Sequence, residues 1–139
     1  MRVTETENHR SLRVLLVEDS LPLRERIRSM IEEAGTVEIV GEAGSVPGAL
    51  VLFRKHQPDA VVLDLQLADG TGYSVLREIK QTHLGCTVIV LTTFTAREFR
   101  VRCLEMGADH FLDKSTEFER VLEVLADLHR VRSRATYYS

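Results

Sequence analysis

The sequence has few cysteines, no excess of basic residues and no long apolar run. Its only two cysteines, Cys86 and Cys103, are too few for a disulfide framework or a four-cysteine metal site. The net charge of −3 excludes a strongly basic protein that binds nucleic acid through bulk charge. No apolar run approaches the roughly 18 residues of a membrane span. Residues 1–11 also lack the apolar stretch of a signal peptide. We therefore expect a reduced, cytoplasmic protein without membrane contact.

The length and composition fit one globular domain. The chain has 139 residues, of which 44% are hydrophobic and 28% charged. These are ordinary globular values, and roughly 100–200 residues make one domain. We expect residues 1–11 to form a disordered or extended tail, residues 12–130 the domain, and residues 131–139 a C-terminal tail.

Short apolar runs alternate with longer segments of helical periodicity along the chain. The runs at 60–63 and 87–91 contain almost no polar residues, as strands covered on both faces require. Similar runs lie at 14–17, 37–40 and 110–112. The helical segments begin near Ser20, Ser45, Gly72, Thr95 and Thr116, and the last of these has the form of a capping box. The pattern predicts a doubly wound α/β fold of five parallel strands with helices on both faces.

Polar residues directly after the strands carry most of the functional information, because such sheets bind ligands beyond the carboxyl ends of their strands. Glu18 and Asp19 follow the first strand, Asp64 the third, Thr92 the fourth and Lys114 the fifth. Neighbouring carboxylates repel one another, which favours a bound Mg²⁺. An ammonium and a hydroxyl beside them suit phosphoryl transfer onto a carboxylate.

These motifs resemble the receiver domain of bacterial two-component response regulators over about residues 12–128. The resemblance rests on the acidic pair Glu18-Asp19, on VVLDLQLADGTG around Asp64, on VIVLTT around Thr92 and on GADHFLDK ending at Lys114. It implies a flavodoxin-like (βα)5 fold with the strand order 2-1-3-4-5.

The resemblance also implies a role for each acidic residue. Asp64 would accept a phosphoryl group from a sensor histidine kinase or a phosphotransfer protein. Asp19, Asp64 and the backbone carbonyl of Gln66 would hold Mg²⁺. Glu18 would lie behind them and act through water or as a supporting acid.

In the same family, a threonine and an aromatic residue carry the signal away from the site. Thr92 and Lys114 would bind the phosphoryl oxygens, and Phe111 would turn inward when Thr92 moves. The fourth helix, fifth strand and fifth helix, about residues 95–130, would then bind a downstream protein or a second copy of the chain. We expect a signalling domain that catalyses its own phosphorylation and dephosphorylation, and not an enzyme with a metabolite substrate.

Three positions depart from the family pattern. Ala68 and Ser115 replace prolines, and Phe111 replaces a frequent tyrosine. A non-proline cis bond costs about 2.5–4 kcal/mol. The Lys114–Ser115 bond should therefore be trans, or the lysine loop shifted.

Two other functions stay open. The chain could be the receiver half of a longer DNA-binding transcription regulator, or an interaction module that works without phosphorylation. The eleven residues after Leu128 cannot hold a helix-turn-helix, so we expect no direct nucleic-acid binding by this chain. The complete set of Asp19, Asp64, Thr92 and Lys114 argues against the second alternative.

Overall fold

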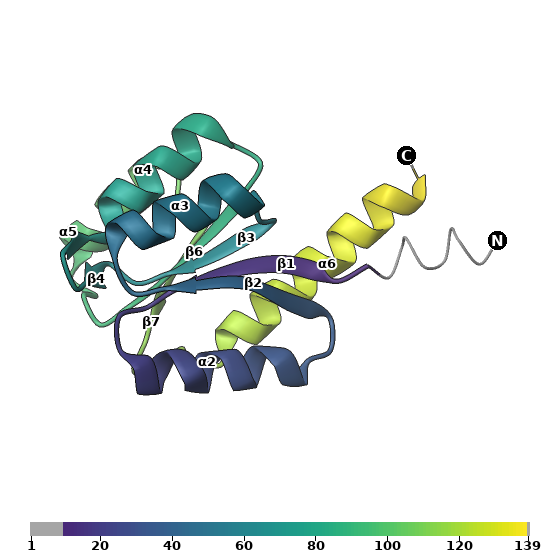
Figure 1. The fold of residues 1–139 in the computed structure, drawn as a ribbon, viewed down its shortest axis with the longest axis horizontal. Coiled ribbons are helices and arrows are strands. Elements are labelled where there is room, and N and C mark those ends of the chain that lie inside the picture. Colours follow the sequence, from purple (N-terminus) through teal and green to yellow (C-terminus); the bar gives the residue numbers. More distant parts are fainter. Residues whose placement is uncertain (1–9, 139) are drawn as a thin grey trace.

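Strands and helices alternate along residues 10–138, the part of the chain that the computed structural model describes (Figure 1). The strands are β1 (Leu12–Val17), β2 (Val37–Ala43), β3 (Ala60–Leu63), β4 (Gln66–Leu67), β5 (Gly70–Thr71), β6 (Thr87–Thr92) and β7 (His110–Asp113). The helices are α2 (Leu21–Glu33), α3 (Val46–His56), α4 (Gly72–Thr82), α5 (Arg97–Glu105) and α6 (Arg120–Tyr138). None of these helices has the length and apolar composition that crossing a bilayer demands. Residues 1–9 of the expected N-terminal tail lie outside the described residues.

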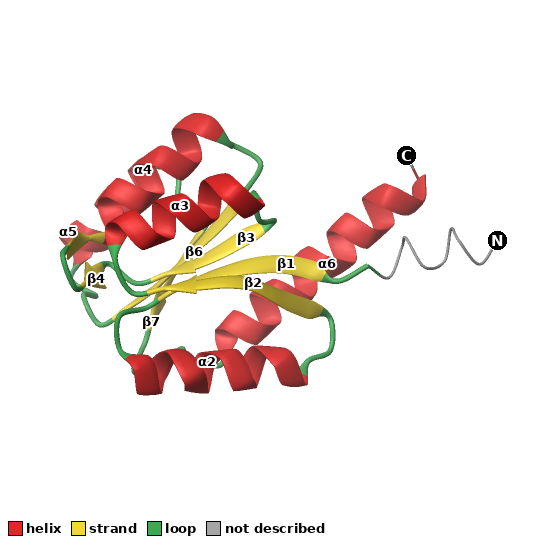
Figure 2. Cartoon of the chain, viewed as in Figure 1, coloured by secondary structure: helices red, strands yellow, loops and turns green. Residues whose placement is uncertain are grey.

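One parallel sheet of five strands has the order β2-β1-β3-β6-β7 (Figure 2). This is the predicted order 2-1-3-4-5, because β6 and β7 are the fourth and fifth strands of this sheet. Val17 pairs with Leu63, and Leu63 with Val90. The carboxyl ends of β1, β3 and β6 therefore lie level with one another, and the flavodoxin-like fold is confirmed.

Helices cover both faces of the sheet, as predicted. Helices α3, α4 and α5 pack on the core that contains Val61 and Leu63, while α2 and α6 pack on the core that contains Ala60 and Val62. All four side chains are at most 2% exposed. Successive residues of β3 thus point into opposite cores, which explains its unbroken apolar sequence. Figure 1 shows α2 on the opposite side of the sheet from α3 and α4.

The predicted starts of the first two helices are confirmed. Ser20 caps α2, since its hydroxyl accepts a hydrogen bond from the Leu23 amide at 3.4 Å. Ser45 caps α3 through the Gly48 amide at 3.1 Å. Helix α2 therefore begins three residues after Glu18, which places its first turn beside the acidic pair at the end of β1.

The capping box predicted at Thr116 is wrong, because α6 begins at Arg120 and turns precede it. The carboxylate of Asp113 accepts hydrogen bonds from the Ser115 amide at 2.8 Å and from its hydroxyl at 2.6 Å. Glu117 Oε1 accepts from the Asp113 amide at 2.9 Å. The carboxylates of Asp113 and Glu117 thus accept hydrogen bonds from backbone amides of the turn, which favours the turn over a helix at these residues. The helix begins only at Arg120.

Helix α6 continues to Tyr138, through most of the stretch expected as the C-terminal tail, and residue 139 lies outside the described residues. Arg132 Nη2 donates to the Gly85 carbonyl at 3.1 Å, and its Nη1 lies 3.5 Å from Asp59 Oδ1. Both partners precede a strand of the sheet. The helix is therefore attached to the amino-terminal edge of the sheet beyond the point where the apolar pattern ends.

Candidate functional site

The polar residues predicted at the strand ends meet at one edge of the sheet. Glu18 and Asp19 follow β1, Asp64 follows β3, Thr92 ends β6 and Lys114 follows β7. Because β1, β3, β6 and β7 are successive neighbours in the sheet, these five residues converge from four strands.

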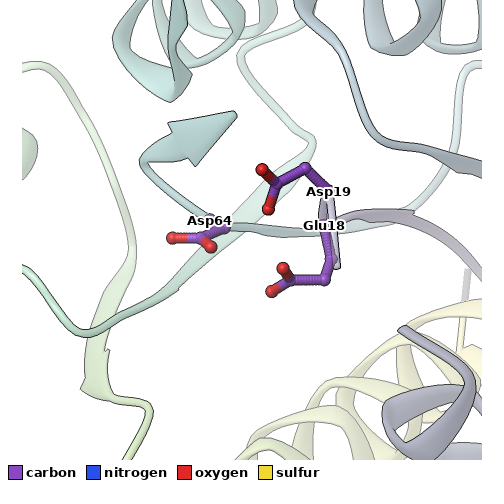
Figure 3. A group of neighbouring side chains, drawn as sticks. All are labelled: Glu18, Asp19 and Asp64. Carbon is purple, nitrogen blue, oxygen red and sulfur yellow. The ribbon is translucent and has the colours of Figure 1, made fainter. Parts of the chain in front are cut away.

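Three carboxylates form the centre of this site (Figure 3). One oxygen from each of Glu18, Asp19 and Asp64 lies within 4.8 Å of the other two. Glu18 is 2% and Asp64 5% exposed, whereas Asp19 is exposed. Buried carboxylates this close need compensating positive charge.

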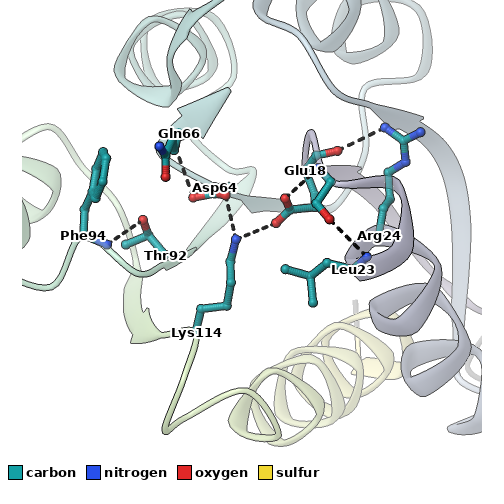
Figure 4. A network of polar contacts seen from close by, with 9 residues as sticks. Glu18, Leu23, Arg24, Asp64, Gln66, Thr92, Phe94 and Lys114 are labelled. Atoms are coloured by element: carbon teal, nitrogen blue, oxygen red, sulfur yellow. Dashed lines mark hydrogen bonds and ion pairs between the residues drawn. The ribbon is translucent and has the colours of Figure 1, made fainter. Parts of the chain in front are cut away.

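Lys114 supplies part of that charge by bridging the two buried carboxylates (Figure 4). Its Nζ lies 2.7 Å from Glu18 Oε1 and 2.6 Å from Asp64 Oδ2. The ammonium and the three carboxylates still leave a formal charge of −2. This balance and the oxygen-only donor set fit a hard divalent cation such as Mg²⁺.

The pKa values reflect this arrangement. Burial raises the pKa of Glu18 above its usual value, against the opposing effect of hydrogen bonds from Lys114 and the Ser20 amide. Burial alone would lower the pKa of Lys114, but hydrogen bonds to Asp64 and Glu18 outweigh it and raise that pKa. Lys114 therefore remains an ammonium at neutral pH.

Backbone hydrogen bonds hold the two buried carboxylates in place. The Ser20 amide donates to Glu18 Oε2 at 3.0 Å, and the Gln66 amide donates to Asp64 Oδ1 at 3.2 Å. Gln66 thus contacts Asp64 through its N–H, while the predicted metal bond of its carbonyl stays a prediction.

Thr92 and Phe111, the two predicted switch residues, both lie inside the domain. Thr92 is fully buried, and its Oγ1 accepts a hydrogen bond from the Phe94 amide at 3.1 Å. The Phe111 ring is 5% exposed, and the guanidinium of Arg100 in α5 lies 5.1 Å from its centroid. The aromatic side chain is therefore packed against α5, with no hydroxyl to bond.

The replaced prolines leave the backbone at the site regular. No cis peptide bond occurs among the described residues, so the Lys114–Ser115 bond is trans, as predicted. The Ala68 amide donates to the Gly44 carbonyl at 3.4 Å, in the turn between β4 and β5. Asp69 lies in the same turn, and its carboxylate accepts a hydrogen bond from the Val46 amide at 3.0 Å.

Two residues support the site in ways that were not predicted from the sequence. Arg24 Nη1 donates to the backbone carbonyl of Glu18 at 3.0 Å. Gly72 lies so close to Asp64 that a Cβ on it would stand 2.4 Å from the Asp64 carbonyl oxygen. A glycine at position 72, directly after Asp69-Gly70-Thr71, is typical of such a close approach between backbones. No feature of the sequence indicates a role for Arg24.

The fold and the site together define a doubly wound α/β domain with a carboxylate pocket suited to a divalent cation. The chain belongs to the response regulator receiver domain family, whose family model matches residues 14–126. Receiver domains are signalling domains that bind Mg²⁺ at an acidic pocket. They interact with histidine kinases or phosphotransfer proteins and with downstream effectors.

Similar proteins come from several bacteria. The chain is 28% identical to the chemotaxis protein CheY of Bacillus subtilis over 81% of its length and 93% of that protein. It is 30% identical to the sensory transduction protein LytT of Bacillus anthracis over 82% of its length and 46% of that protein. The receiver domain of the response regulator NarL of Mycobacterium tuberculosis superposes with a TM-score of 0.80 at 25% identity, over 87% of this chain and 98% of that one.

Proposed function

We propose that this chain accepts a phosphoryl group on Asp64, in a Mg²⁺-dependent reaction, from a histidine kinase or a phosphotransfer protein. One observation carries the proposal. The Asp64 carboxylate is 5% exposed, lies in a cluster with Glu18 and Asp19, and contacts Lys114 Nζ at 2.6 Å. A buried aspartate surrounded by such groups is a strong candidate for chemistry.

Asp64 would act as the nucleophile. One of its oxygens would attack the phosphorus of a phosphohistidine, so that an O–P bond forms while the N–P bond breaks. The imidazole would leave with the electron pair of the broken bond and take up a proton from solvent. Lys114 Nζ, beside Asp64 Oδ2, would pair with the phosphoryl oxygens as a point charge. The hydroxyl of Thr92 would donate to another of these oxygens.

The metal would be held by Asp19, Asp64 and the backbone carbonyl of Gln66, with Glu18 supporting it. Bound Mg²⁺ would supply charge neutralisation for the phosphoryl oxygens. Lys114 donates to both Glu18 and Asp64 in the structure. It would have to give up at least one of these hydrogen bonds to contact a phosphoryl group.

The output would leave the site through the surface formed by α5, β7 and α6. Thr92 and Phe111 would be the switch residues, and Arg100 of α5 covers the Phe111 ring. Phosphorylation would alter this surface and thereby the binding of a downstream protein or of a second copy. We propose a cytoplasmic location and no direct contact of this chain with nucleic acid.

A second candidate is a receiver that regulates an attached DNA-binding domain. The chain spans about half the length of the curated relatives it matches first, 46% of LytT and 53% of the transcriptional regulatory protein YdfI of Bacillus subtilis. An immunoblot of the source cells with an antibody against this chain separates the two. A band at the mass of this chain supports a separate partner, and a band of about twice that mass supports a fused output.

Intact-mass spectrometry after incubation with Mg²⁺ and acetyl phosphate tests the proposal. We expect one phosphoryl adduct on the parent protein, none without Mg²⁺ and none on D64N. D69N is the matched control, because Asp69 is an exposed carboxylate nearby that caps a backbone amide. It should be phosphorylated like the parent. An adduct on D64N would contradict the proposal, and so would a folded parent protein that gains no adduct either from acetyl phosphate or from a phosphorylated histidine kinase.

A further inference from the structure

Arg24 reaches from the first turn of α2 to the backbone of the acidic pair (Figure 4). Its Nη1 donates to the carbonyl oxygen of Glu18 at 3.0 Å. That carbonyl belongs to the peptide group that joins Glu18 to Asp19. The hydrogen bond therefore restrains the orientation of the backbone from which the Asp19 carboxylate projects.

The guanidinium is held from its other side by Glu42 of β2. Arg24 Nε lies 3.4 Å from Glu42 Oε1, and the arginine side chain is 20% exposed. Nε forms no regular hydrogen bond, so the attraction to Glu42 is that of an ion pair. A cation placed between a strand carboxylate and the Glu18 carbonyl has little freedom to move.

Gly44, which follows β2, leaves the space that this arrangement needs. A Cβ on Gly44 would lie 3.1 Å from Arg24 Nη1 and 3.3 Å from the Cα of Asp19. It would also lie 3.5 Å from the Glu18 carbonyl oxygen. The loop after β2, the guanidinium and the acidic pair are therefore packed as one unit.

We propose that Arg24 is a positioning residue that fixes the peptide group between Glu18 and Asp19 and thereby sets the Mg²⁺ affinity of the pocket. The inference about affinity rests on the proposed function. Groups that orient metal ligands are worth about 10–100-fold in metal affinity. Arg24 contacts no carboxylate of the pocket, so its effect would pass through the backbone.

The sign of the effect separates positioning from simple electrostatics. A cation near a metal site repels Mg²⁺, so its removal would tighten binding if charge alone mattered. Loss of the bond to the Glu18 carbonyl would weaken binding, because Asp19 would no longer be held ready for the metal. Weaker binding by R24M is therefore the outcome that only positioning explains.

Calorimetric titration of the purified, metal-free protein with MgCl₂ tests this. R24M should bind Mg²⁺ about 10-fold more weakly than the parent. R24K, which keeps the charge and can still donate a hydrogen bond, should recover part of the loss. The matched control is R28M, because Arg28 also pairs with Glu42, at 3.5 Å, but is 43% exposed and forms no bond to Glu18. It should stay within about twofold of the parent, since an exposed ion pair contributes little.

Amide hydrogen exchange without Mg²⁺ gives a second readout. The Glu18 amide donates to the Ala43 carbonyl at 2.9 Å, and the Ser20 amide donates to Glu18 Oε2 at 3.0 Å. Both amides should exchange several-fold faster in R24M, while amides in the centre of β3 stay unchanged. If R24M does not fold, the Mg²⁺ titration and the hydrogen exchange are both measured on R24K.

The outcomes distinguish this inference from the proposed function. A parent protein that binds no Mg²⁺ would refute the proposed metal site and the claim about affinity, and the exchange rates would still decide whether Arg24 positions the peptide. A parent protein that binds Mg²⁺, together with an R24M variant that binds equally or more tightly, would overturn the role of Arg24 alone. A loss of stability without a change in affinity would also overturn it, because Arg24 would then be merely structural.

Discussion

Replacing Gly72 with alanine should push α4 away from the backbone of Asp64. Gly72 is the first residue of α4, and its amide donates to the Leu65 carbonyl at 2.8 Å. A Cβ on Gly72 would stand 2.4 Å from the Asp64 carbonyl oxygen and 3.1 Å from the Cα of Leu65. Carbon–oxygen contacts between backbones lie at about 3.3–3.6 Å, so the two segments must separate by about 1 Å.

The cost of this separation follows from what the Cβ contacts. Both neighbouring atoms belong to the backbone, so no side-chain rotation can relieve the overlap. Overpacking of this kind costs about 1–3 kcal/mol. In a domain of this size, each kcal/mol lowers the melting temperature by roughly 3–5 °C. G72A should therefore melt clearly below the parent protein, with the Asp64 carboxylate displaced from its partners.

Thermal and urea unfolding of G72A and G70A, followed by circular dichroism, measures this. Gly70 is the matched control, because a Cβ there meets only Val46 Cγ2, at an ordinary 3.5 Å. G70A should stay within about 1 kcal/mol of the parent, since alanine at a permissive site mainly restricts the unfolded chain. Equal stability of G72A and G70A would refute the reasoning.

Three further predictions concern groups away from the site. Burial raises the pKa of Cys86 to about 12 and that of Cys103 to about 11, so a thiol reagent at pH 8 should label the folded protein far more slowly than the unfolded one. A hydrogen bond from Arg54 lowers the pKa of Glu78, so R54M should be slightly less stable than the parent protein at pH 7. This difference should vanish as the pH falls through the lowered pKa of Glu78, because the ion pair contributes only while Glu78 is ionised. In R132M, the backbone amides in the last turns of α6 should exchange hydrogen with solvent faster than in the parent protein, while the amides of the sheet stay protected.

Each of these predictions has a result that contradicts it. Rapid labelling of the native protein would show that the two thiols are accessible. A stability deficit of R54M that persisted in strong acid would show that Arg54 stabilises the fold through packing and not through its charge. Unchanged exchange in R132M would mean that the bonds of Arg132 to Asp59 and Gly85 do not hold the helix.

The fold and the location of the site follow from local features of the sequence. Apolar runs such as residues 60–63 mark strands buried on both faces, and the polar residue after each run marks the edge where ligands bind. Parallel register then brings Asp64, Thr92 and Lys114 together, as the structure shows. The roles of these residues stay predictions, because proximity does not establish phosphorylation.

The contacts that hold the site together could not be predicted in the same way. Lys114 is shared by Glu18 and Asp64, which lie 96 and 50 residues away in the chain, so only the folded structure shows which carboxylates it bridges. Arg24 reads as a polar-face residue of an amphipathic helix, yet its guanidinium turns back toward a carbonyl. The hairpin of β4 and β5 has two residues per strand, too few to produce any periodicity.

Under the proposed function, Thr92 connects the phosphoryl site to α5 through one hydrogen bond. Its Oγ1 accepts from the Phe94 amide at 3.1 Å, and the Phe94 ring stacks on Phe99 of α5 with the ring centroids 5.2 Å apart. If rotation carried Oγ1 toward a phosphoryl group on Asp64, the Phe94 amide would lose its acceptor, at a cost of about 1–3 kcal/mol if it stayed unpaired. The loop between β6 and α5 would move so that the Phe94 amide finds another acceptor. Because the Phe94 ring stacks on Phe99, this movement would also shift α5. The output surface would therefore respond even if Phe111 kept its buried position.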